Sequence, residues 1–157
     1  MKTFLTTLSA LAIAVPAFAE EKEIAMDEAP EAAVATAEAN SGGRDFEAVL
    51  YQVEDGVEMY EFIGTKDDGL GFGVEVLPDG TLLETAETIT MDEVPEAVMA
   101  TFTAELPGFE PEQIERNTRD GGALVVYEFE GEIDGALVEA EIHEDGSNFA
   151  NVAEEES

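Results

Sequence analysis

The residue best suited to chemistry in this 157-residue sequence is His143, its single histidine. It lies close to Glu141 and Glu144, so it could in principle bind a metal or act as a base. A transition-metal site needs several nitrogen or sulfur donors at set spacing, however, and the sequence contains no cysteine. Ser147, the one serine near His143 in sequence, lies in a turn and is a poor candidate nucleophile. We therefore expect no metal-binding and no catalytic residue, and the protein is predicted not to be an enzyme.

Carboxylates dominate the remaining chemistry, because 38 Asp and Glu residues stand against six Lys and Arg residues. A glycosidase needs one pair in a cleft with one raised pKa, but a chain this acidic produces pairs by chance. It also has no tryptophan to stack on a sugar. Several turns contain Asp-Gly and could suggest Ca²⁺, yet none has the EF-hand order of ligands, and Asp-Gly is common in hairpins. We expect no cofactor, and only weak binding of divalent cations by crowded carboxylates.

The formal net charge of −32 limits the possible partners. Nucleic-acid-binding proteins need basic patches, so the charge excludes DNA or RNA as a ligand. Repulsion among the acids also strains the folded chain at low ionic strength, and salt with a Debye length of about 8 to 10 Å relieves this strain. A salty habitat is therefore one explanation of the acidity, and a function of the acidic surface is another.

Residues 1–19 have the pattern of a secretory signal peptide. Lys2 precedes an apolar run that is shorter than the ~20 residues of a membrane-spanning helix, and the segment ends in Ala-Phe-Ala before Glu20. We expect cleavage before Glu20, no membrane span in the mature chain, and a periplasmic or extracellular location. Without cysteine, the exported chain must be held together by packing alone.

A repeated phrase divides the rest of the chain into two similar units. Met-Asp-Glu-Ala-Pro-Glu-Ala at 26–32 recurs as Met-Asp-Glu-Val-Pro-Glu-Ala at 91–97, and further similar segments follow at nearly the same offset. We predict a first repeat at 20–88, a second repeat at 89–150 and a disordered acidic tail at 151–157.

Each repeat is expected to begin with a helix. In the second repeat, Val94, Val98 and Phe102 recur every four residues and form an apolar stripe. The first repeat has alanine at the equivalent positions 29, 33 and 37, which can bury much less surface. We therefore expect the first helix to be frayed or loosely docked.

Alternating apolar and polar residues predict strands after each helix, at 46–53, 59–64, 70–77, near Ile114, at 124–131, at 136–143 and, briefly, at 148–152. A unit of about 65 residues with a single helix is marginal alone. The predicted fold class is therefore α+β, with two helix-plus-antiparallel-strand repeats that share one antiparallel sheet. Both helices would cover one face, and the other face would be open.

The second repeat resembles a PepSY-type domain. The resemblance rests on Glu93–Glu115, a helix with an early proline that a Pro-Gly turn closes, and on Tyr127–Gly146, two strands that end in Asp-Gly. The first repeat departs from the pattern in its alanine-rich helix and in Ser-Gly-Gly-Arg-Asp, which replaces the Pro-Gly turn. The PepSY-like branch of this family is similar to secreted β-lactamase-inhibitor proteins. The resemblance thus implies an exported inhibitory or ligand-binding module with tandem copies on one sheet.

The open face of the predicted sheet is the candidate partner-binding surface. Strand alternation places on it Glu61, Glu75, Glu128, Glu130, Glu139, Glu141, His143, Val126 and Leu137. The acids suit a partner with a basic or mixed surface, and the apolar residues could form a desolvated centre. We expect an exported, non-catalytic PepSY-like protein that binds or inhibits a protein partner. The alternative is an acidic envelope protein that binds divalent cations weakly.

Overall fold

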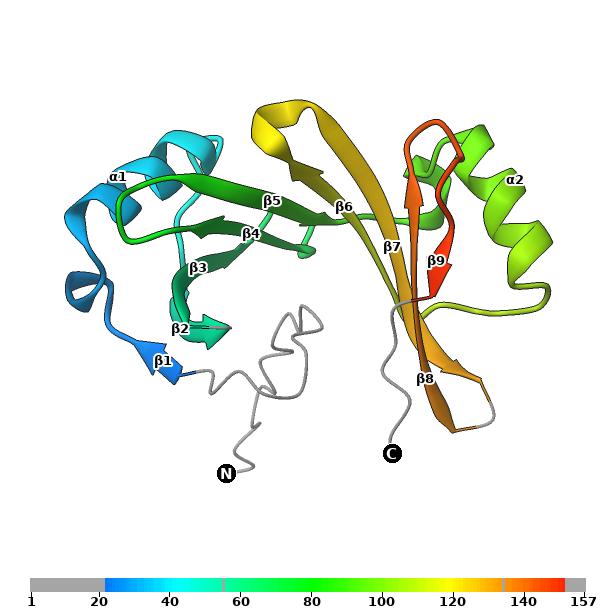
Figure 1. Ribbon diagram of the computed structural model, residues 1–157, viewed down its shortest axis with the longest axis horizontal. Coiled ribbons are helices and arrows are strands. Elements are labelled where there is room, and N and C mark those ends of the chain that lie inside the picture. The colour runs from blue at the N-terminus through cyan, green and yellow to red at the C-terminus, as the bar shows by residue number, and fades with distance from the viewer. Residues whose placement is uncertain (1–21, 55, 134, 152–157) are drawn as a thin grey trace, which may run out of the picture.

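The computed structural model of the chain describes residues 22–54, 56–133 and 135–151. These residues form one antiparallel sheet whose nine strands follow one another in chain order (Figure 1). The strands are β1 (Lys22–Ile24), β2 (Ala48–Glu54), β3 (Val57–Thr65), β4 (Gly71–Val76), β5 (Leu82–Thr88), β6 (Gln113–Arg119), β7 (Leu124–Ile133), β8 (Ala136–His143) and β9 (Ala150–Asn151). The predicted signal peptide, and the predicted tail apart from Asn151, lie outside the described residues.

The predicted fold class of two helix-plus-strand repeats is wrong. Strands make up 46% of the described residues and helices 23%, so a single nine-stranded sheet defines the molecule. Its two α-helices, α1 (Glu31–Asn40) and α2 (Glu96–Glu105), are short segments that lie against the sheet (Figure 1). Within the described ranges, neither these helices nor the short 3₁₀ turns are long and apolar enough to cross a membrane.

Strand β5 is the element that makes the sheet continuous. Its sequence, Leu-Leu-Glu-Thr-Ala-Glu-Thr, has few large apolar residues and does not by itself predict a strand. β5 nevertheless pairs with β4, where Glu75 faces Glu84, and with β6, where Glu84 faces Arg119. Because β5 is hydrogen-bonded on both sides, the strand ladder runs on from the first half of the chain into the second.

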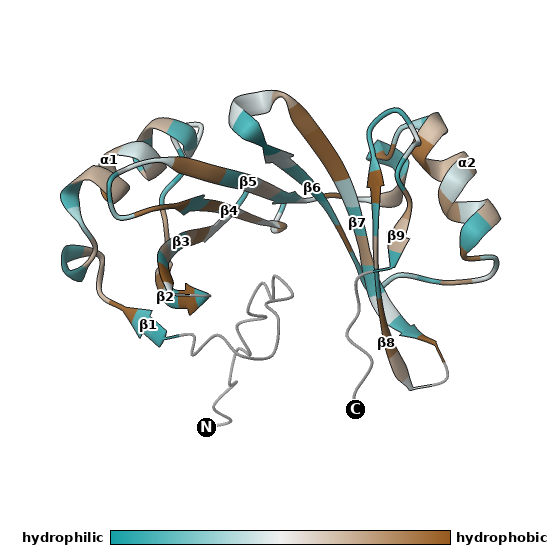
Figure 2. Ribbon diagram, viewed as in Figure 1, coloured by the Kyte–Doolittle hydropathy of each residue, from teal (hydrophilic) through white to brown (hydrophobic). Residues whose placement is uncertain are grey.

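The hydrophobic core lies between the helices and one face of the sheet, and it has two parts (Figure 2). In the first part, Ala33 and Ala37 of α1 pack against residues of β2, β3 and β4. In the second part, Val98 and Phe102 of α2 pack against residues of β6, β7 and β8. The ring of Phe102 stacks on that of Phe129, with the ring centroids 4.2 Å apart. Each helix therefore covers its own half of the sheet.

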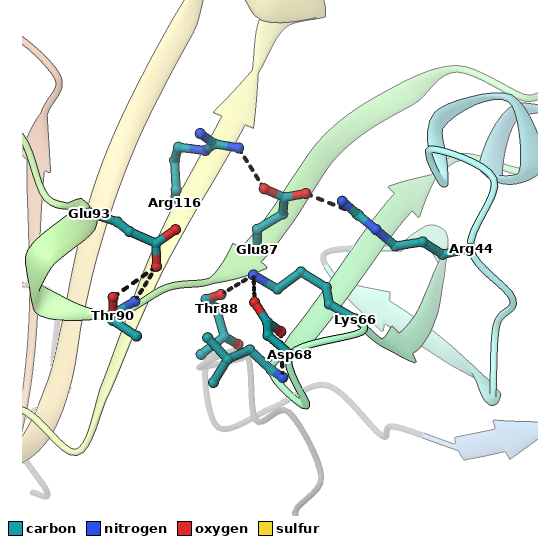
Figure 3. A network of polar contacts seen from close by, with 9 residues as sticks. Arg44, Lys66, Asp68, Glu87, Thr88, Thr90, Glu93 and Arg116 are labelled. Atoms are coloured by element: carbon teal, nitrogen blue, oxygen red, sulfur yellow. Dashed lines mark hydrogen bonds and ion pairs between the residues drawn. The ribbon is translucent and has the colours of Figure 1, made fainter.

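A polar seam separates the two parts of the core (Figure 3). Glu87 of β5 accepts hydrogen bonds from Arg44 at 2.9 Å and from Arg116 at 2.5 Å. Register places Phe72 opposite Glu87, Glu87 opposite Arg116 and Arg116 opposite Tyr127. Since directly opposite residues point to the same face, the seam and both parts of the core share one face of the sheet.

The repeated phrase builds the same helix entrance twice. In each copy, the glutamate of Met-Asp-Glu accepts a hydrogen bond from the backbone N–H three residues earlier, at 3.0 Å for Glu28 and 2.9 Å for Glu93. Pro30 and Pro95 then stand directly before α1 and α2, where a missing N–H breaks no helical hydrogen bond. The phrase is therefore accounted for by helix initiation.

Each helix is also tied to a turn that contains Asp-Gly. The Thr36 hydroxyl donates to the carbonyl of Gly80 at 2.8 Å, and the Thr101 hydroxyl donates to that of Gly146 at 2.6 Å. Both glycines have positive φ, and a Cβ at Gly146 would lie 2.6 Å from the carbonyl oxygen of Ala97. These turns thus serve as docking points for the helices.

The two helices should both resist changes of side-chain volume, because α1 is not loosely docked. Ala33 and Ala37 are both fully buried, which corrects the expectation of a frayed first helix: small side chains let α1 lie close to the sheet. We predict that Phe102→Ala lowers the free energy of unfolding by about 3 to 5 kcal/mol and that Ala37→Leu lowers it by about 1 to 3 kcal/mol. Urea denaturation measures both values.

The matched control is Ala35→Leu, which adds the same volume at an exposed position of α1. It should change the free energy of unfolding by less than about 0.5 kcal/mol. An equally small effect of Ala37→Leu would mean that α1 is loosely docked after all.

Candidate functional site

The face of the sheet opposite the helices carries rows of carboxylates. Register places Glu61, Glu75, Glu84 and Arg119 opposite one another on four consecutive strands, and places Glu115, Glu128 and Glu141 likewise on three. We call this surface the acidic face and define it by Gln52, Glu54, Glu61, Glu75, Glu84, Gln113, Glu115, Asn117, Arg119, Val126, Glu128, Glu130, Glu132, Leu137, Glu139, Glu141 and His143.

All the partner-binding candidates predicted from the sequence lie on the acidic face. They differ in accessibility, since Leu137 is 59% exposed whereas Val126 is 1% exposed. Leu137 is therefore available for contact, and Val126 is part of the interior. His143 lies at the end of β8, where its Nδ1 is 3.0 Å from the side-chain nitrogen of Asn148.

The centre of the acidic face is not the open, solvated surface that the sequence predicted. The exposed fraction is 0% for Glu115, 2% for Glu61 and 3% for Glu128, although the described helices pack on the other face. Burying a carboxylate is costly unless it is hydrogen-bonded, paired with a cation or neutralised by a proton. Each buried carboxylate on the acidic face therefore needs a hydrogen-bond donor, a cation or a bound proton.

Four residues central to the acidic face escaped the sequence prediction: Glu84, Glu115, Asn117 and Arg119. They lie on β5, which was not predicted, and on β6, which was predicted only as a short strand near Ile114; both strands are largely polar on both faces, so apolar alternation is weak in them. The one available signal was the spacing of Glu115, Asn117 and Arg119, which alternate as strand residues must.

Arg119 is the one cation on the acidic face within the described part of the chain. Its guanidinium donates to Glu84 and, at 2.8 Å, to Oε1 of Glu141. Burial lowers the pKa of Arg119, but its hydrogen bonds with Glu141 and Glu84 outweigh this and raise it, so Arg119 stays charged. Burial raises the pKa of Glu84, and the pairing with Arg119 partly offsets the rise.

Side-chain amides donate hydrogen bonds to two carboxylates of the row that Glu115, Glu128 and Glu141 form. Gln113 donates to Oε1 of Glu115, and Asn117 donates to Oε2 of Glu128, each at 2.9 Å. Oδ1 of Asn117 is buried and has no hydrogen-bond partner among the described residues, whereas Glu115 is also hydrogen-bonded to the side chain of Thr88, which lies opposite it on β5. Burial, followed by the charge of Glu128, raises the pKa of Glu115 to about 7. Glu115 is thus a buried carboxyl group that can hold a proton at neutral pH.

Glu128 lies among further carboxyl groups. Glu130 and Glu139 face each other across β7 and β8, and both carboxyl groups act on the pKa of Glu128, which burial raises. Burial, followed by the charge of Glu128, raises the pKa of Glu130 and that of Glu139 to about 8 each. Two carboxyl groups can form a hydrogen bond only when one carries a proton. Burial and the charge of Glu128 thus favour the protonated form of Glu130 and of Glu139.

We call Glu115, Glu128, Glu130 and Glu139 the four-carboxyl cluster. Its chemistry is that of a proton store or a cation receptor, because it offers carboxyl groups and unpaired acceptors without a cation of its own. In the described ranges, no group of three or more His, Cys, Asp or Glu side chains is placed to hold a metal ion. The cluster is therefore the best candidate for the functional centre of the face.

Comparison with known proteins identifies a fold relative. A DUF2874 family protein from Bacteroides ovatus ATCC 8483 has a similar structure, with a TM-score of 0.61 over 80% of this chain and 89% of its own. The two sequences are 13% identical, so the likeness concerns the fold alone and fits a β-rich antiparallel domain. The sequence matches no family model and no curated protein.

We predict that the free protein loses stability as the pH rises through neutrality. The pKa values of Glu115, Glu130 and Glu139 in the folded state lie above the unfolded value of about 4.3. At any pH between the unfolded and the folded pKa values, the folded state therefore binds more protons than the unfolded chain. The free energy of unfolding should therefore fall from about pH 4.5 to about pH 8. Urea denaturation across this range in high salt, which screens general repulsion, measures the trend.

The double variant Glu130→Gln, Glu139→Gln mimics the neutral carboxyl groups and should flatten this dependence. The control Glu54→Gln, Glu132→Gln removes two charges from the same face outside the cluster and should keep it. A wild-type protein whose stability rises over this range would contradict the assignment of protons to the cluster.

Proposed function

We propose that the protein is an exported, non-catalytic binding module of PepSY-like type that holds a protein partner with basic side chains on its acidic face. The observation that carries the proposal is the placement of carboxylates directly opposite one another on neighbouring strands, as in Glu75 opposite Glu84 and Glu128 opposite Glu141. Like charges in such pairs destabilise a sheet. A face that costs the free protein stability is expected where function requires it.

The chemistry of the acidic face selects the kind of partner. Arg119, its one cation among the described residues, is already paired with Glu84 and Glu141, so the face offers acceptors in excess. A partner that brings Lys or Arg side chains would relieve the repulsion and gain electrostatic steering. Leu137, exposed on β8 beside these carboxylates, supplies an apolar contact at the rim.

Two further parts of the proposal, export and the PepSY-like assignment, rest on sequence patterns. Export rests on the signal-peptide pattern of residues 1–19, which lie outside the described part of the chain. The PepSY-like assignment rests on the proline-initiated helix and on the strands that end in Asp-Gly, and these correspond to α2, β7 and β8. The relation implies an inhibitory or ligand-binding role.

Site-specific crosslinking tests the proposed surface. A photoreactive amino acid replaces Leu137 on the acidic face or, as the control, Met91, which is 38% exposed next to α2. In the native envelope fraction, position 137 should capture a defined protein and position 91 should not. The purified partner must then bind the purified protein in high salt. Capture from position 91 alone would place the interface on the helix-covered side.

The kinetics of the captured pair should separate charge from apolar contact. At about pH 8, replacing Glu128, Glu130, Glu139 and Glu141 by Gln should slow association roughly tenfold and flatten its salt dependence, because the net charge of a binding face acts mainly on the encounter. Leu137→Ser should instead speed dissociation. Surface plasmon resonance measures both rates, and rates that ignore both changes would contradict the proposed interface.

A further inference from the structure

We propose that the free edge of β8, at residues 136–139, takes up an extended segment of the partner as a further antiparallel strand, with basic side chains on the acidic face. This inference rests on the proposed function, since it assigns the manner in which the same surface binds. It adds the position of the contact, the conformation of the ligand and its sequence pattern.

Strand β8 has a neighbour on both sides along only part of its length. β7 pairs with the whole of β8, whereas β9 pairs only with its residues Ala140 and Glu141. In the described part of the chain, no strand therefore lies beyond residues 136–139 of β8. The register with β7 runs along this segment without a shift, and the segment contains neither proline nor lysine. A regular edge of this kind is a template for another strand.

The backbone groups at this edge point toward the place of the added strand. The N–H of Glu144, just after β8, donates to the carbonyl of Val125 on the β7 side, and the N–H of His143 donates to that of Ser147 in the turn to β9, each at 3.0 Å. Successive residues of an antiparallel strand direct their N–H and C=O groups to alternate sides. Leu137, an even number of residues before His143, therefore directs its N–H and C=O away from β7.

The two faces beside the free edge set the sequence pattern of the ligand. On the acidic face, Leu137 is 59% exposed, with Glu132 opposite it on β7 and Glu139 after it on β8. A Lys or Arg side chain there would pack its stem on Leu137 and place its charge near these carboxylates. On the other face, Val138 is buried in the second part of the core, so apolar residues suit the added strand. The pattern is an alternation of basic and apolar residues.

Charge selects a separate basic chain over other strands that could occupy this edge. A second copy would bring its own acidic face beside the first, and the formal net charge of −32 opposes such a dimer. Residues 152–157 follow β9 outside the described residues and include three successive glutamates. Continuing the register of β9 would set Glu154 opposite Leu137 and near Glu132, where like charges repel. A basic segment meets opposite charge instead.

Titration calorimetry of the wild-type protein with the peptide Lys-Val-Lys-Val-Lys-Val-Lys tests strand addition. In an antiparallel pair, the residues opposite Leu137 and Glu139 exchange backbone hydrogen bonds with them, so the lysine N–H groups face β8 and the valine N–H groups face solvent. N-methylation of every lysine should therefore weaken binding roughly tenfold or more, because it removes these donors. The matched control, N-methylation of every valine, should change the affinity by less than about threefold.

A pair of variants tests the same contact from the side of the protein. Leu137→Pro removes the outward N–H without removing a hydrogen bond to β7, and proline is tolerated at such edge positions. Leu137→Val is the matched control, since it keeps the N–H at a similar side-chain size. The proline variant should bind the peptide roughly tenfold more weakly than the valine variant. Equal affinities of the two folded variants would contradict strand addition, and if the proline variant does not fold, the N-methylated peptides decide with the wild type.

The outcomes separate this inference from the proposed function. Equal effects of the two N-methylations, with an affinity that still falls after the four Glu→Gln substitutions of the kinetic test, would overturn strand addition alone. An affinity that ignores those four substitutions would overturn the proposed function as well. A wild-type dimer that Leu137→Pro dissociates, measured by sedimentation equilibrium, would assign the edge to a second copy. Roughly tenfold tighter peptide binding after deletion of residues 152–157 would assign it to the chain's own C-terminal segment.

Discussion

The structure depends on one constraint, the placement of like-charged carboxyl groups opposite one another on neighbouring antiparallel strands. Glu115 faces Glu128, and Glu130 faces Glu139, on a face where these side chains are largely buried. Such pairs cost stability unless each charge is compensated. The molecule compensates them in three ways, with the guanidinium of Arg119, with side-chain amides, and with protons retained near neutral pH.

This constraint explains why the sheet is built as a meander with its core on one face. Carboxylates occupy much of one face, with Leu50, Met59 and Val126 buried among them, and the two parts of the core that α1 and α2 cover lie on the other. The middle strands β5 and β6 are polar on both faces, so backbone hydrogen bonds and the Glu87 seam hold the two halves together. A continuous strand ladder thus takes the place of a continuous hydrophobic core.

Period-two patterning predicted the faces of β3, β4, β7 and β8, and so it placed Glu61 and Glu128 on the correct side of the sheet. It failed for β5, because a strand that is polar on both faces lacks the apolar alternation on which such predictions depend. The alanines of α1 led to the wrong expectation of a frayed helix for a different reason. Small side chains bury less area, but they also let the helix lie closer to the sheet. Burial of Glu115 could not be read from sequence either, because it depends on neighbours from three strands.

The most direct test of this account is a carbon-13 NMR titration of the glutamate side-chain carboxyl groups in the folded protein. Glu115, Glu130 and Glu139 should keep their protons to near or above neutral pH, with apparent pKa values of about 7 to about 8. Glutamine variants at the three positions assign the signals. If all glutamates instead titrate close to the ordinary value of about 4.3, the cluster holds no protons at neutral pH and the account is contradicted.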